Sequence, residues 1–320
     1  METLPVETPV LEPEAQFGVD WRRVGIYCGI AYGLAIVVGT VVYILSRNVQ
    51  PFDPNAQTIS LIITLLVAGG YMWAPGLAHI FTRLITKEGF RGIGLHPNFR
   101  KGWKFWLLAW ILPVAISLLG TAVYYLFFPA YYDGGMSMVV EQYRQAGMGL
   151  NVTPLMVLGI QLMNVMLIAP VINSFATLGE EFGWRAYLLP KLMPLGPAKA
   201  MLISGVIWGA WHWPLTLQGH NYGLEYWGAP WLGMLVMLVF TFSLGTLFSW
   251  LSIRGGSVWP AVIGHAMLNG VGGIGVLWMT GSPNLLFGPI VAGLVAGLPF
   301  TLLAVYLIWR RKPLMAAQAA

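Results

Sequence analysis

Eight long runs of apolar residues, separated by short polar stretches, dominate the pattern of this chain. Each run can supply the roughly 20 helical residues that a crossing of ~30 Å of hydrocarbon requires. The pattern therefore predicts an all-α, polytopic integral membrane protein of about eight transmembrane helices. The expected spans are Val24–Leu45, Thr58–Phe81, Phe105–Phe128, Thr153–Leu178 with a continuation toward Leu189, Ala200–Leu217, Trp231–Ile253, Val258–Thr280 and Leu285–Trp309.

Composition excludes a soluble domain. The chain is 57% hydrophobic and only 9% charged, whereas soluble domains carry roughly 25% charged residues. The main partner is therefore the lipid bilayer. The net charge of +5 is better explained by loop cations that orient the protein than by nucleic-acid binding.

The chain divides into a membrane domain and two short tails. Residues 1–20 are acidic and proline-rich, so we expect a disordered cytoplasmic tail without a cleavable signal peptide. Residues 21–312 form the expected transmembrane domain, and residues 313–320 a short C-terminal tail. The single cysteine, Cys28, excludes an intramolecular disulfide.

Lysine and arginine indicate the orientation. With the N-terminus inside and alternating spans, all of them except Arg47 and Arg144 fall on the cytoplasmic side. This is a strong positive-inside pattern and predicts that both termini are cytoplasmic.

The short, simple loops favour a prokaryotic plasma membrane. The basic loop between spans two and three either lies on anionic headgroups or is an ordinary loop. The oligomeric state cannot be predicted.

Two small-xxx-small pairs, Gly29 with Gly33 and Gly293 with Gly297, predict places where helices approach closely.

Two adjacent acids, Glu180 and Glu181, lie in an otherwise apolar helical stretch. An ionisable group at membrane depth costs about 2.5–3.5 kcal/mol on insertion scales, so it needs a partner or a function. Arg185 follows Glu181 at the favourable i,i+4 spacing. We therefore expect Glu181 to pair with Arg185, and Glu180 to be free for chemistry.

Histidines supply the next candidates. His212 and His265 lie within the fifth and seventh expected spans. His79 ends the second span, His96 lies in the basic loop and His220 in an outer loop, and these three are expected to be non-functional.

The candidate acid and the two histidines are expected at similar depths in the membrane. Glu180, His212 and His265 are each about 16–20 Å of helix from a cytoplasmic cation. Asn269 follows His265 by one turn, and Trp208 precedes His212 by one turn. The sequence therefore predicts a polar cavity between spans four, five and seven that opens toward the cytoplasm.

Three segments carry a resemblance to a known family. They are EEFGWR (Glu180–Arg185), WGAWHWPL (Trp208–Leu215) and GSVWPAVIGHAMLN (Gly256–Asn269). In this order, on separate spans, they resemble the CAAX prenyl protease and bacteriocin-processing family, which includes the type II CAAX prenyl endopeptidases. The resemblance covers about Leu178–Asn269, and Trp208 stands where phenylalanine is common. It implies an intramembrane protease acting on a peptide or prenylated CaaX-type substrate, or on a leader peptide.

Two mechanisms are open. In one, Glu180 is the general base for water, helped by His212, while His265 and Asn269 stabilise the oxyanion; no cofactor is then required. In the other, Glu180, His212 and His265 bind Zn²⁺, a known type of catalytic ligand set, although HExxH spacing is absent. We favour the metal-free mechanism, with Glu181, Arg185 and Trp208 as supporting residues.

Two other functions are compatible with intramembrane acids and histidines. A proton-coupled transporter also uses such residues, but repeated halves are not visible in the sequence. A non-catalytic immunity or scaffold protein of the same fold is the second alternative.

Overall fold

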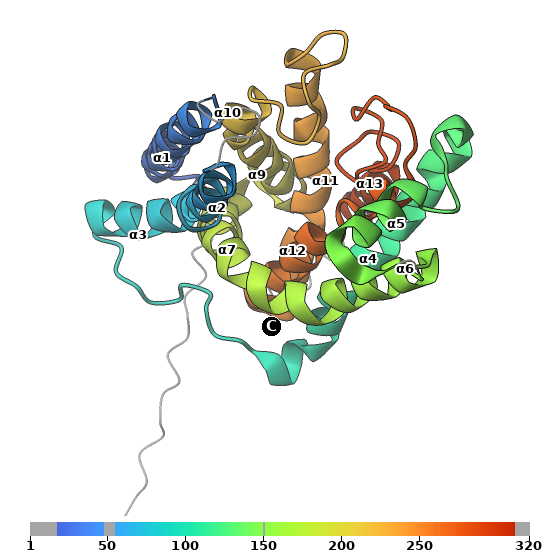
Figure 1. The fold of residues 1–320 in the computed structure, drawn as a ribbon. Coiled ribbons are helices and arrows are strands. Elements are labelled where there is room, and N and C mark those ends of the chain that lie inside the picture. The colour runs from blue at the N-terminus through green and yellow to red at the C-terminus, as the bar shows by residue number, and fades with distance from the viewer. Residues whose placement is uncertain (1–17, 48–54, 150, 311–320) are drawn as a thin grey trace, which may run out of the picture.

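The computed structural model describes residues 18–47, 55–149 and 151–310. Both expected tails lie largely or wholly outside these residues. Within them every regular element is helical, which confirms the predicted all-α fold (Figure 1). The α-helices are α1 Trp21–Arg47, α2 Ala56–Leu66, α3 Ala74–Thr86, α4 Phe99–Phe127, α5 Ser137–Tyr143, α6 Pro154–Met163, α7 Ala169–Gly183, α8 Leu189–Leu192, α9 Pro197–Trp211, α10 Trp213–Thr216, α11 Trp231–Gly255, α12 Trp259–Val271 and α13 Leu298–Trp309.

The expected count of eight spans is not confirmed. Six helical stretches in the described part of the chain are long and apolar enough to cross a membrane. The expected fifth span is instead α9, which ends at Trp211 and is followed by the single turn α10. The expected last span is helical only from Leu298, because the chain before it is rich in glycine and proline, which disfavour helix. The six stretches are Trp21–Arg47, Ala56–Thr86, Phe99–Phe127, Pro154–Leu195, Trp231–Gly255 and Trp259–Trp278.

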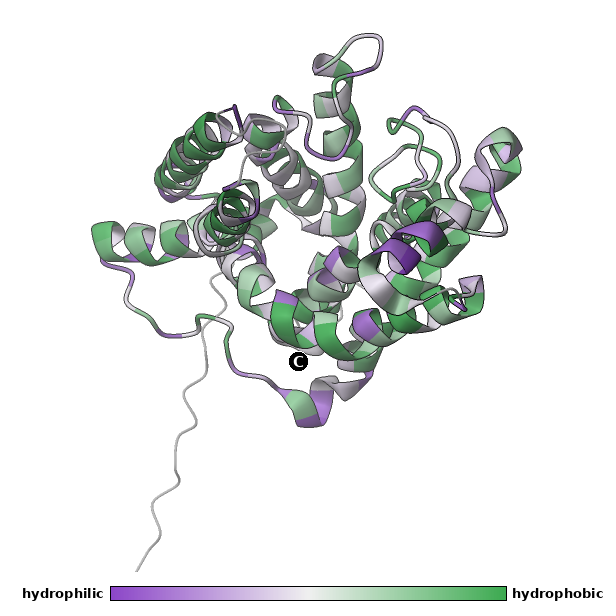
Figure 2. Cartoon of the chain, viewed as in Figure 1, coloured by the Kyte–Doolittle hydropathy of each residue, from purple (hydrophilic) through white to green (hydrophobic). Residues whose placement is uncertain are grey.

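Helix α11 lies at the centre of the bundle. It packs against α9, α13, α4 and α12, while α12 also contacts α4 and α7. In its most apolar window 67% of the residues are buried, compared with 22% for α1. The outer helices are mostly apolar (Figure 2) and expose large side chains such as Ile36, Val37, Val171 and Ile172. Such a surface is suited to lipid.

Helix α3 crosses α7 directly beside the two adjacent glutamates, and glycines make this crossing possible. A Cβ atom on Gly76 would lie 2.7 Å from the carbonyl oxygen of Gly179, and one on Gly183 would lie 2.5 Å from the Pro75 carbonyl carbon. The two backbones are therefore in contact, as small residues allow in membrane helices. This contact fixes the height of α7 and its glutamates against α3.

The two glycine pairs predicted from spacing behave differently. Gly29 and Gly33 lie on the exposed face of α1 with no atom within 4 Å of an added Cβ, so that prediction is wrong. Gly293 and Gly297 do approach backbone closely, but they contact the chain before α13 and not a neighbouring helix. Spacing alone does not tell which face of a helix meets protein.

A charged cluster ties α1, α3 and α8 together at one end of the bundle. Glu88 accepts hydrogen bonds from Lys191 Nζ at 2.6 Å and Tyr187 Oη at 2.6 Å, and lies 3.3 Å from Arg23 Nε. Burial raises the pKa of Glu88, but the hydrogen bonds from Lys191, Tyr187 and Thr86 outweigh it and lower the pKa to about 2.

The basic loop between α3 and α4 packs onto the protein at this same end. The Gly94 carbonyl accepts from Val258 N, the Leu95 carbonyl accepts from Trp259 Nε1, and the Asn98 amide donates to the Gly255 carbonyl. These contacts fix the loop against the α11–α12 turn. We call this end of the bundle, which carries Arg23, Arg254 and the loop cations, the basic face.

Replacing Gly183 by alanine should destabilise the protein. The added methyl group would overlap the α3 backbone, and such overpacking costs about 1–3 kcal/mol. The measurement is thermal unfolding in detergent micelles. Gly29→Ala is the matched control and should be neutral or slightly stabilising, because its Cβ is unobstructed and alanine favours helix. Equal stability of the two variants would contradict the close contact.

Glu88→Gln should lower the free energy of unfolding by about 1–3 kcal/mol, since charge-assisted hydrogen bonds are lost. In the wild type the depressed pKa of Glu88 means that its contribution is fully present above about pH 4.5 and is lost as pH falls toward about 2. Unfolding midpoints measured between pH 7 and pH 3 should therefore fall more for wild type than for Glu88→Gln. Parallel profiles would show that Glu88 contributes nothing at neutral pH.

Candidate active site

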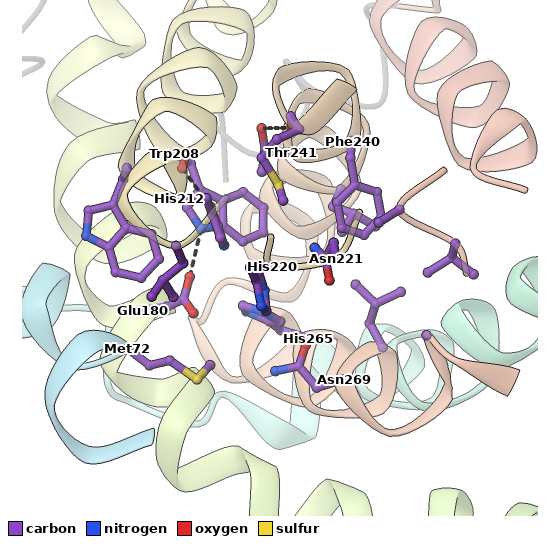
Figure 3. Close-up of a pocket in the computed structure, with 18 of the residues that line it drawn as sticks. Met72, Glu180, Trp208, His212, His220, Asn221, Phe240, Thr241, His265 and Asn269 are labelled. Atoms are coloured by element: carbon purple, nitrogen blue, oxygen red, sulfur yellow. Dashed lines mark hydrogen bonds between the residues drawn. The ribbon is translucent and has the colours of Figure 1, made fainter. Parts of the chain in front are cut away.

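A cavity of ≈370 Å³ lies between α7, α9, α11 and α12. The structure brings four predicted site residues to its wall, Glu180, His212, His265 and Asn269 (Figure 3). Glu180 comes from α7, His212 from the junction of α9 and α10, and the other two from successive turns of α12. Trp208, predicted as a supporting residue, also lines it.

Glu180 has one engaged and one available oxygen. Its Oε2 accepts a hydrogen bond from Trp208 Nε1 at 2.7 Å, while Oε1 has no hydrogen-bond partner among the described residues. The side chain is almost fully buried, with 2% of the residue exposed. The indole thus orients the carboxylate and leaves one oxygen directed at whatever occupies the cavity.

Glu181 is held from two sides. It lies 3.1 Å from Arg185 Nη1, which confirms the predicted i,i+4 pairing. Its Oε1 also lies 2.8 Å from His265 Nδ1, a contact that the sequence did not predict. The Arg185 guanidinium in turn stacks over the Trp208 ring, 4.4 Å from its centroid. The two adjacent carboxylates therefore have different partners.

The hydrogen bonds define how each imidazole faces the cavity. His212 Nδ1 lies 2.9 Å from the Trp208 carbonyl oxygen, which can only accept, so this nitrogen carries the proton. His265 Nδ1 likewise donates to the Glu181 carboxylate. In both neutral rings Nε2 is left with a lone pair. His265 can donate from Nε2 only when it carries a second proton, and Glu181 is the charge that would neutralise it.

The alternative zinc set does not assemble. Among the residues that the structure describes, no three His, Cys, Asp or Glu side chains are grouped so that they could hold a metal ion. Glu180, His212 and His265 share the cavity but are not arranged as ligands of one ion. As arranged, these residues do not fit a metal.

The other three histidines separate into two kinds. His79 is fully buried, with Nδ1 donating to the Phe182 carbonyl and Nε2 accepting from Arg83 Nε. Both of its ring nitrogens therefore have partners within the protein. His96 accepts from the Asn98 backbone in the basic loop. Neither residue lines the cavity.

His220, expected to be a non-functional residue of an outer loop, is among the residues that line the cavity. The chain after α10 turns back, with the His220 amide donating to the Leu215 carbonyl, so that His220 and Asn221 line the cavity (Figure 3). The sequence contained no signal for this, because the direction of a loop is not encoded in periodicity.

The direction of the opening also corrects the sequence-based expectation. Toward the basic face the cavity is closed by fully packed side chains, among them Trp184, Arg185 and Phe248. The exposed lining residues His220 and Gly273 lie toward the opposite helix ends. The cavity therefore does not open on the side of the cations. The length of helix between Glu180 and the nearest cation predicted how deep Glu180 lies in the bundle. It did not predict which end of the bundle the cavity opens to.

Known proteins resemble the part of the chain that builds this site. Residues 160–271 match a family described as type II CAAX prenyl endopeptidase Rce1-like. The CAAX prenyl protease 2 of Methanococcus maripaludis is 29% identical over 93 residues, which is 28% of this chain and 34% of that protein. The match thus spans about a third of the relative's length. The matched segment contains Glu180, His212, His265 and Asn269, and it supports the resemblance to the CAAX prenyl proteases.

Proposed function

We propose that this protein is an intramembrane endopeptidase that hydrolyses peptide bonds with water activated by Glu180. The observation that carries the proposal is the position of Glu180, buried in a largely apolar cavity with one oxygen free and two imidazoles and a carboxamide on the same wall. A buried carboxylate with a free oxygen is suited to proton transfer in a water-poor site.

The proposed reaction begins when Glu180 Oε1 takes a proton from water. The resulting hydroxide attacks the scissile carbonyl carbon, and His212 Nε2 accepts the remaining hydrogen bond and orients the water. Asn269 Nδ2 and the doubly protonated His265 donate to the developing oxyanion. The C–N bond then breaks, and the proton held by Glu180 passes to the leaving amine, so the carboxylate is regenerated.

Glu181, Arg185 and Trp208 support this site without touching the reacting atoms. Glu181 orients His265 and balances its charge, while Arg185 compensates Glu181. Trp208 fixes the rotamer of Glu180. No step in this mechanism needs a metal, and the chelator arm of the cleavage assay tests this.

The proposed substrates are peptide segments associated with the membrane. Much of the cavity wall is apolar, including Met237, Phe240, Leu244 and Leu268, which suits a hydrophobic chain or a lipidated peptide. A prenylated CaaX tail and a leader peptide both fit this description. The family match favours a protease over a proton-coupled transporter.

Glu180→Gln should reduce peptide cleavage by about 10²–10⁴-fold, the usual contribution of a general base. Asn269→Ala should cost about 10²–10³-fold, as for other oxyanion donors. Cleavage is measured with purified protein in detergent, with and without a chelator, and should be insensitive to chelation. Glu225→Gln, on the exposed loop before α11, is the control and should retain activity. Undiminished cleavage by Glu180→Gln would reject the proposal.

Replacing Glu181 should destabilise the protein much more than replacing Glu180. Glu181→Gln leaves Arg185 buried without its counter-charge and should cost about 3–5 kcal/mol. Glu180→Gln keeps the Trp208 hydrogen bond through the amide oxygen and should change stability little. Thermal unfolding of both variants in the same detergent checks this. If Glu180→Gln were the more damaging change, the assigned roles would have to be exchanged.

A further inference from the structure

The cavity has a closed end and an open end, and these lie on opposite sides of the bundle. Glu181, Trp184 and Phe248 are completely buried beneath Glu180, on the side of the basic face. Because this layer lies between Glu180 and the basic face, none of the described residues that line the cavity lies at the basic face. The other end is lined by His220, Asn221 and Gly273, which follow α10 and α12.

Helix lengths give the same arrangement. Phe240 lines the cavity and precedes Arg254 by 14 residues of the continuous helix α11, which corresponds to about 21 Å. His212 is 13 residues beyond Lys199, or about 20 Å. The lining therefore extends away from the cations, from the middle of the bundle to its opposite end.

The described cations gather at the closed end. Arg23 and Lys191 meet at Glu88, and Arg254 lies over Phe105 at the start of α4. Within the described part of the chain only Arg47 and Arg144, at the far ends of α1 and the α5 segment, belong to the open end. Cations flanking membrane helices are retained on the cytoplasmic side.

We infer that the catalytic cavity is reached from the extracytoplasmic side of the membrane. The substrate is then a peptide segment exposed outside the cytoplasm, such as the extracytoplasmic flank of a membrane-anchored or exported chain, and not a cytosolic prenylated tail. His220 and Asn221 form the rim that such a segment passes on its way to Glu180. The nature of the substrate rests on the proposed function, whereas the sidedness does not.

The single cysteine makes the test direct. Cys28→Ala removes every thiol from the chain, and new cysteines report on each end. His220→Cys probes the rim, Glu225→Cys the exposed loop beside it, and Arg91→Cys the basic loop. Each variant is treated with a membrane-impermeant maleimide, as intact spheroplasts and after lysis.

Glu225→Cys and His220→Cys should label in intact spheroplasts to the level reached after lysis, whereas Arg91→Cys should label at least tenfold more after lysis. Labelling of Arg91→Cys in intact spheroplasts, with protection of Glu225→Cys, would overturn the inferred orientation. Labelling of Glu225→Cys without any labelling of His220→Cys, even after lysis, would overturn the position of the rim.

Labelling requires no enzymatic activity, so it stands apart from the test of proteolysis. If Glu180→Gln abolishes cleavage while Arg91→Cys is labelled in intact spheroplasts, the proposed protease activity is supported and the inferred extracytoplasmic access is rejected. If cleavage is never observed but His220→Cys is labelled in intact spheroplasts, the inferred extracytoplasmic access is supported and the proposed function is rejected.

Discussion

The interaction on which the site depends is the ion pair between Glu181 and Arg185 inside the membrane domain. Both side chains are almost wholly excluded from solvent, with side-chain exposures of 0% and 1%. Charges in such surroundings persist only when each has a partner, because their desolvation is costly. The pair satisfies that condition. It also contacts other residues of the site, since Glu181 orients His265 and Arg185 stacks on the Trp208 ring that holds Glu180. One buried pair thus positions groups from three helices.

The backbone contact between α3 and α7 supports this arrangement. Gly76, Gly179 and Gly183 let the two helices touch immediately beside the glutamates, so the carboxylates are held by main chain as well as by side chains. At the basic face Glu88 joins α1, α3 and α8. The side chains of the candidate site are therefore fixed by rigid elements, which is what a preorganised site requires.

Much of the helical fold and the grouping of the candidate site residues could be predicted from the sequence. Apolar runs gave most of the membrane helices, and the cost of charge in lipid singled out Glu180 and Glu181. Spacing gave the Glu181–Arg185 pair and placed Asn269 beside His265, and depth brought His212 to the same cavity. Contacts that depend on how loops turn and which helix faces meet could not be predicted. His220 returns to the cavity through a loop, Gly29 and Gly33 face outward, and the cavity opens away from the cations.

The proposed activation of water by Glu180 has a chemical consequence that isotope labelling measures directly. A single turnover of peptide cleavage in H₂¹⁸O, followed by mass spectrometry of the product and of the peptide containing Glu180, reports where the solvent oxygen goes. If Glu180 acts only as a base, one ¹⁸O enters the new carboxyl terminus of the product and none enters the enzyme. Incorporation of ¹⁸O into the Glu180 side chain would show a covalent acyl intermediate and contradict activation of water by this carboxylate.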